Sequence, residues 1–89
     1  MPSFTSGGQL ADDGGVIISD GDTDAHTPAS GYSEFYGIVA LTEVVVSAAT
    51  MHASWTGTLA GETIPAGAAL PVRFTSITLT SGSLVCFQR

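Results

Sequence analysis

The residues that could do chemistry begin with three aspartates spaced two positions apart. Asp20, Asp22 and Asp24 have the D-x-D-x-D spacing with which a calcium loop presents its carboxylate ligands. An EF-hand would also need Gly at the sixth position and Glu at the twelfth, where this chain has Ala25 and Gly31. We therefore interpret the segment as a solvated acidic loop, with a looser calcium site as the alternative.

The two histidines and the single cysteine lack partners at a catalytic or metal-binding spacing. His26 has no second His or Cys close to it in the sequence, which argues against a transition-metal site. His52 is interpreted as an exposed or interface histidine, and the chain has no G-x-S-x-G elbow for serine hydrolysis. Cys86 lies in an apolar run, which is typical of a buried, inert thiol. We therefore expect no enzyme activity and no cofactor.

Charged side chains are scarce, and this limits the partners of the chain. They make up 11% of the 89 residues, the net charge is −6, and the only two cations are Arg. Two Arg cannot replace the counterions of nucleic acid or cover an anionic lipid surface, so neither nucleic acid nor a membrane is an expected partner. Arg73 precedes an apolar residue of a predicted strand, so we expect an ion pair with Glu43, Glu62 or an N-terminal aspartate.

Residues 1–31 differ in composition from the rest of the chain. They hold six of the eleven Gly and five of the eight acidic residues, so we predict an extended N-terminal arm. The apolar points of this arm are Phe4, Val16, Ile17 and Ile18. Two alternatives are open: these residues contact another subunit or a shell, or the arm folds back as an edge strand of its own domain.

Residues 32–89 predict a β-domain with a net charge of −1. Turn residues separate short runs of apolar and β-branched residues, and helical spacing is absent, so we expect an all-β fold. The architecture is a small antiparallel β-sandwich or jelly-roll-like barrel that carries the N-terminal arm. The predicted strands are 36–41, 44–49 with both faces buried, 51–56, 68–70, 72–80 and 84–87, and residues 58–64 lead into the turn at Pro65.

The stretch 72–80 contains a change of phase. Phe74 is apolar at an even position, whereas Ile77 and Leu79 are apolar at odd positions. Because side chains alternate between the faces of a strand, these three residues can share one core only if a bulge lies near residues 75 and 76. Pro65 and Gly67 mark the turn before this stretch, with Gly67 in the left-handed conformation.

Two hypotheses about the aromatic residues differ in whether these side chains are buried or exposed. Trp55 is expected to pack in the core or in an interface. In the alternative, Trp55, or Tyr32 with Tyr36, lines an exposed face of a carbohydrate-binding β-module at a tail tip or fibre.

The second half of the chain resembles a family of virion proteins. Residues 58–67 read TLAGETIPAG, and residues 72–85 read VRFTSITLTSGSLV. This pattern resembles the spike base proteins of gene transfer agents and related tailed phages, over roughly residues 37–89. The resemblance implies a structural protein of the capsid exterior, a head spike base or decoration protein that is synthesised in the bacterial cytoplasm. It implies a homo-oligomer, as a pentameric ring at a vertex, that contacts the major capsid protein and a spike or fibre protein.

Overall fold

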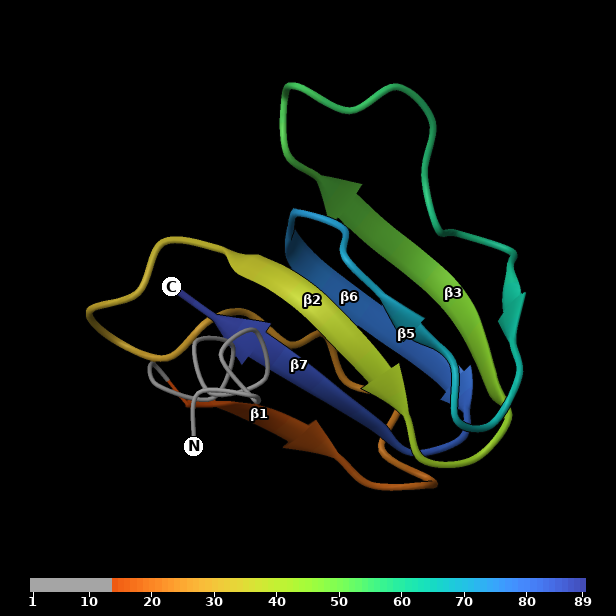
Figure 1. Ribbon diagram of the computed structural model, residues 1–89. Helices are drawn as coiled ribbons and strands as arrows, with labels where there is room; N and C mark the ends of the chain where they lie inside the picture. Colours follow the sequence, from red (N-terminus) through yellow and green to blue (C-terminus); the bar gives the residue numbers. More distant parts are fainter. Residues whose placement is uncertain (1–13) are drawn as a thin grey trace, which may run out of the picture.

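The computed structural model describes residues 14–89, and all of their regular structure is antiparallel β-sheet (Figure 1). The predicted all-β fold is therefore confirmed for this part of the chain. None of these residues forms a helix that could cross a membrane. The strands are β1 (Gly15–Ile18), β2 (Phe35–Ala40), β3 (Val44–Met51), β4 (Thr63–Ile64), β5 (Ala69–Leu70), β6 (Phe74–Ser81) and β7 (Leu84–Gln88).

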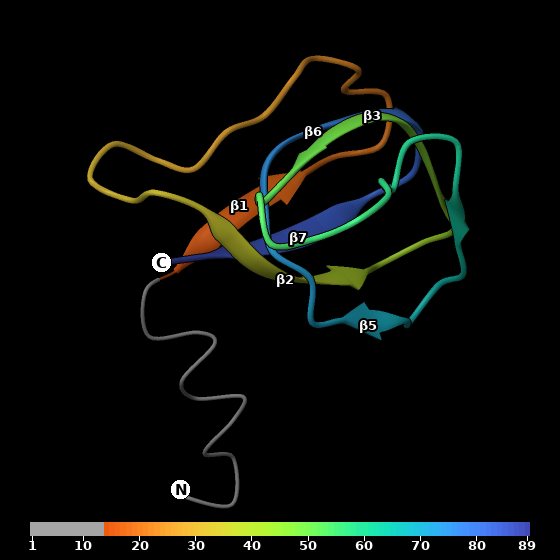
Figure 2. The ribbon, with the colours of Figure 1, turned by 90° about the horizontal axis from the view of Figure 1, so that it is seen from above.

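The seven strands form one sheet that folds over on itself. Their order is β1-β7-β2-β6-β3-β4, and β5 pairs with β2 beside this path. The link between β2 and β6 is a single pair, Phe35 with Phe74, so the sheet can bend sharply there. Figure 2 shows the result: β3 and β6 lie across the interior from β2 and β5. The fold is thus a small sandwich made from one continuous sheet.

The core lies between the two halves of the folded sheet. Phe35 and Phe74 are fully buried, and their ring centroids are 5.0 Å apart, at the point where the halves join. Ile77 and Leu79 are buried beside them, as the sequence predicts. The other buried apolar residues are Ile18, Ile38, Ala40, Val44, Val46, Ile64, Leu84 and Cys86.

The predicted bulge is present in β6. Thr50 pairs with Ser76 and Met51 pairs with Phe74, so Thr75 is an extra residue on the β6 side. This insertion shifts the alternation by one residue and lets Phe74 face the same core as Ile77. The predicted turn is present as well: the Ala68 N–H donates to the Pro65 carbonyl, and Gly67 has a φ of 83°.

Two predictions, about the runs 44–49 and 51–56, are wrong. Residues 51–56 do not form a strand, because the His52 ring accepts the Ser54 N–H and the His52 carbonyl accepts the Trp55 N–H. These local bonds turn the chain away from the sheet after Met51. The strand β3 is also not buried on both faces, since Ser47 and Ala48 are exposed.

Candidate functional site

Part of the predicted arm is a strand of the domain. Residues 15–18 pair with β7 of the same chain, from Gly15 opposite Phe87 to Ile18 opposite Leu84. Ile18 is fully buried and Val16 packs against the core, while the Ile17 side chain is 69% exposed on the outside. Phe4 lies outside the described residues. For residues 15–18, the structure thus has the edge-strand arrangement.

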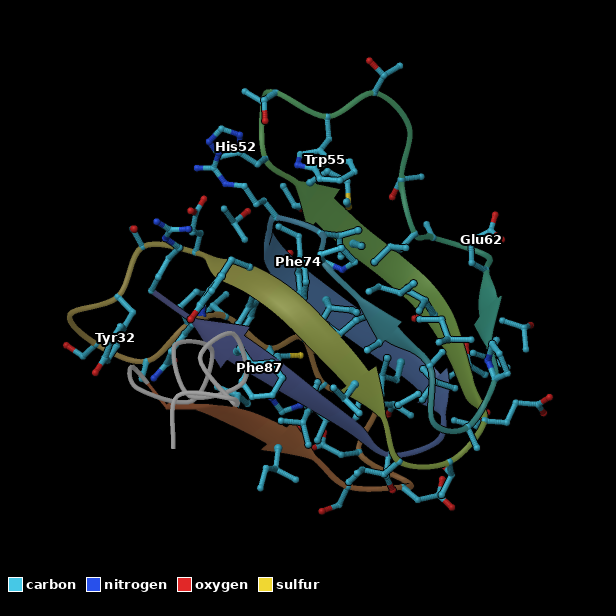
Figure 3. The ribbon with its side chains drawn as sticks, in the orientation of Figure 1. Tyr32, His52, Trp55, Glu62, Phe74 and Phe87 are labelled. Carbon is cyan, nitrogen blue, oxygen red and sulfur yellow. The ribbon has the colours of Figure 1, made fainter. Side chains whose placement is uncertain are left out.

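The outward side chains of β1, β7 and β2 form an apolar face, which we define as Ile17, Val39, Val85 and Phe87. Ile17 stands opposite Val85, and Val85 stands opposite Val39, so these three form one row across the strands. Phe87 stands in the next row, over β7 in Figure 3. None of these four residues is charged. Ile17 is exposed and the other three side chains are partly exposed, so apolar atoms of this face are in contact with solvent.

Glycines on both sides of Phe87 give the apolar face its relief. Phe87 pairs with Gly15 on β1 and with Gly37 on β2, and neither neighbour has a side chain. A hollow lies on each side of the ring. The hollow toward β2 has a volume of about 120 Å³ and continues to Leu70 and Pro71. The hollow toward β1 has a volume of about 180 Å³. Such a surface is suited to receive protruding apolar side chains.

A second feature is a cluster of charges around Glu34. This carboxylate is only 10% exposed, and it accepts hydrogen bonds at 2.9–3.2 Å from Nε and Nη2 of Arg73. The Arg89 Nε lies 3.7 Å from the same carboxylate, and the Arg89 guanidinium stacks over the Tyr36 ring at 5.0 Å. The His52 Nε2 lies 3.2 Å from the Arg73 guanidinium. Both cations of the chain thus meet one carboxylate.

The partner of Arg73 differs from the expected ones. The sequence suggested Glu43, Glu62 or an N-terminal aspartate, and the structure has Glu34 in that place. Glu34 directly precedes Phe35, and Arg73 directly precedes Phe74. Because Phe35 and Phe74 pair antiparallel, Glu34 and Arg73 are diagonal neighbours, within reach of each other only through their long side chains.

The aspartates of the acidic loop at residues 20–24 have different partners and do not converge on one site. Asp20 accepts the Gly82 N–H and its own N–H donates to the Ser83 hydroxyl, which ties the loop to the turn before β7. Asp22 lies 3.1 Å from the His26 ring. The Asp24 N–H, and secondly His26, lower the pKa of Asp22 below its usual range. Within residues 14–89, no group of three or more acidic, His or Cys side chains converges as a metal site.

Trp55 is exposed to solvent, whereas Cys86 is buried. Trp55 does not belong to the core, because the turn at His52 carries it into the loop between β3 and β4, where it is 42% exposed. Tyr32 is 40% exposed in the loop before β2, on a different side of the molecule (Figure 3). Cys86 is fully buried, and burial raises the pKa of its thiol to about 12.

Comparisons of this chain with models of protein families, with curated proteins and with solved structures find no match. The candidate site consists of an uncharged apolar face with two hollows and a charged cluster whose cations already contact a carboxylate.

Proposed function

We propose that this chain is a structural protein of a virion, a head spike base or capsid decoration protein that links the shell to a projecting fibre. The observation that carries the proposal is the apolar face, an uncharged surface built on a hydrogen-bonded sheet. Contiguous apolar surface with hollows is typical of lasting contact between proteins. The resemblance of residues 58–67 and 72–85 to spike base proteins supports the same assignment.

The charge distribution also favours an assembly role. Residues 32–89 carry three Glu and two Arg, and one Glu already contacts both Arg. A nearly neutral domain can lie close to identical neighbours without strong repulsion. We therefore propose a homo-oligomer that contacts the major capsid protein on one side and a spike or fibre protein on the other.

The experiment is to follow the protein through the purification of particles from a producing bacterial culture. We expect it to band with the major capsid protein in a density gradient, to remain bound in high salt, and to be labelled by antibodies on intact particles. Phe87→Ala should reduce incorporation, because it removes the ring between the two hollows. Tyr32→Ala, which truncates an exposed aromatic residue away from the apolar face, is the matched control. Protein that stays at the top of the gradient would refute the proposal.

A second candidate is a carbohydrate-binding module of a tail tip or fibre. The exposure of Trp55 favours it, because a sugar ring can stack on an accessible indole. The expected result is binding on a glycan array that Trp55→Ala abolishes and Tyr32→Ala does not. An array on which the native chain binds nothing removes this candidate.

A further inference from the structure

Among residues 14–89, the strand β1 lies at an edge of the sheet. The Gln88 N–H donates to the Gly14 carbonyl, so Gly14 bonds directly to β7. Hydrogen bonds in an antiparallel pair alternate, so Val16 and Ile18 also direct their backbone groups toward β7. The N–H and C=O groups of Gly15 and Ile17 therefore point away from β7. Gly15 and Ile17 are both exposed, and the described residues place no further strand beside β1.

This edge lacks the features that keep sheet edges apart. The four residues of β1 are Gly, Val, Ile and Ile, so the strand contains no Lys, no Pro and no inward charge. Edges of soluble β-proteins that remain unpaired usually carry such residues. The composition of β1 therefore favours pairing with another strand.

The side chains of β1 indicate which strand fits. Ile17 is 69% exposed, and the hollow of about 180 Å³ lies over Gly15 of the same strand, between Ile17 and Phe87. Suppose that two copies of β1 pair antiparallel about a two-fold axis at Val16. Ile17 of each copy then stands opposite Gly15 of the other, on the apolar face. Each Ile17 side chain fills the hollow of the other copy.

We propose that two copies of this chain associate through β1, edge to edge and antiparallel, with Ile17 of each copy in the hollow beside Phe87 of the other. The protruding Ile17 and the hollow over Gly15 lie two positions apart on the same strand. A two-fold axis between two copies therefore places each Ile17 in the hollow of the other copy. The two sheets become continuous and their apolar faces join. This inference depends on β1 alone and does not require the virion role, and its closed two-fold contact differs from the ring that the resemblance implies.

The first test is the mass of the full chain in solution, by light scattering after size exclusion, at protein concentrations up to about 1 mM. We expect a species of twice 9.0 kDa. Ile17→Lys puts a charge into the hollow and should raise the dissociation constant at least about 30-fold, as for other central interface residues. Leu41→Lys, at an aliphatic residue that is 53% exposed elsewhere, should leave the dimer intact. A monomer at the highest concentration, a larger ring, or a dimer insensitive to Ile17→Lys would overturn the proposal.

The second test fixes the register by cross-linking. At the proposed axis, Val16 faces Val16 of the other copy in a pair without hydrogen bonds, whose Cα atoms lie about 4.5 Å apart. That separation suits a disulfide, so Val16→Cys should form covalent dimers under mild oxidation. Thr42→Cys, at an exposed position in the turn between β2 and β3, is the control and should stay monomeric on a non-reducing gel. Native Cys86 stands opposite Val16 in β7 and would compete for a disulfide within the chain, so both variants are made in a Cys86→Ala background. A Val16→Cys dimer that forms no cross-link would overturn the register.

Discussion

The ion pair of Glu34 with Arg73 allows a quantitative test of how the fold is held together. Glu34 directly precedes β2, and Arg73 directly precedes β6, so the pair joins the two halves of the sheet where they meet. The perturbation is Glu34→Gln, which keeps the volume of the side chain and removes its charge. Arg73→Gln removes the other partner, and the double variant completes a thermodynamic cycle.

The magnitude follows from the burial of the two side chains. Surface ion pairs contribute about 0–1 kcal/mol, whereas removal of one partner from a buried pair costs about 3–5 kcal/mol. The Glu34 side chain is only 10% exposed, but that of Arg73 is 41% exposed, so water screens part of the attraction. We therefore expect Glu34→Gln to cost about 2 kcal/mol and the coupling energy of the pair to be about 1–2 kcal/mol.

The assay is urea denaturation of the native chain, the two single variants and the double variant, with thermal melting as a second measurement. For a chain of this size, about 2 kcal/mol corresponds to a fall in Tm of roughly 10 °C. Glu62→Gln is the control, because this exposed carboxylate should change stability by less than about 0.5 kcal/mol. The effect of Glu34→Gln should persist at high salt, since a mostly buried carboxylate is weakly screened.

The coupling energy shows whether the ion pair of Glu34 with Arg73 stabilises the fold. A value below about 0.3 kcal/mol would mean that the bidentate contact contributes nothing beyond its separate halves, and the physical account would be refuted. A cost of Glu62→Gln equal to that of Glu34→Gln would refute it as well, because net charge alone would then explain both.

Three further predictions concern single positions. Gly82→Ala should cost about 1–3 kcal/mol more than Gly67→Ala in urea denaturation, because both have a positive φ but only a Cβ at Gly82 would overlap the Glu43 carbonyl and the Val44 backbone. Equal costs would show that strain of φ alone matters. The Cys86 thiol keeps its proton up to about pH 12 in the folded state, whereas the unfolded thiol ionises near 9.0. Stability should therefore fall by about 1.4 kcal/mol per pH unit within this window, and Cys86→Ala should remove that slope; an unchanged slope would contradict the assignment. The lowered pKa of Asp22 stabilises the fold above pH 3.8, and this contribution is lost as pH falls through the folded value, so the difference between the native chain and Asp22→Asn should shrink at acid pH.

Several elements could be predicted from the sequence because their causes are local. Alternating apolar residues and turn residues predicted β2, β3, β6 and β7 to within two residues at each end. The change of phase in β6 required a bulge, and the bulge is at Thr75. The prediction failed at residues 51–56, because backbone bonds to the side chain and carbonyl of His52 outweighed a β-like composition and left Trp55 exposed.

The partners across the sheet were beyond the reach of the sequence, since pairing joins segments that lie far apart in the chain. Composition does not say which of the acidic residues meets Arg73; the single pair of Phe35 with Phe74 decides that it is Glu34. The apolar run at residues 84–87 is β7, and only the structure shows that it lies between β1 and β2.

The sequence by itself determined the class of the fold, its strands and its lack of charge, because these depend on residue type and on period. Only the tertiary structure decided the form of the surface. It laid β1 beside β7, placed Phe87 between Gly15 and Gly37, and so created hollows that no single strand contains. The physical reason is that a glycine makes a hollow only when a neighbouring strand sets a large side chain beside it, and register across a sheet is a property of the folded chain.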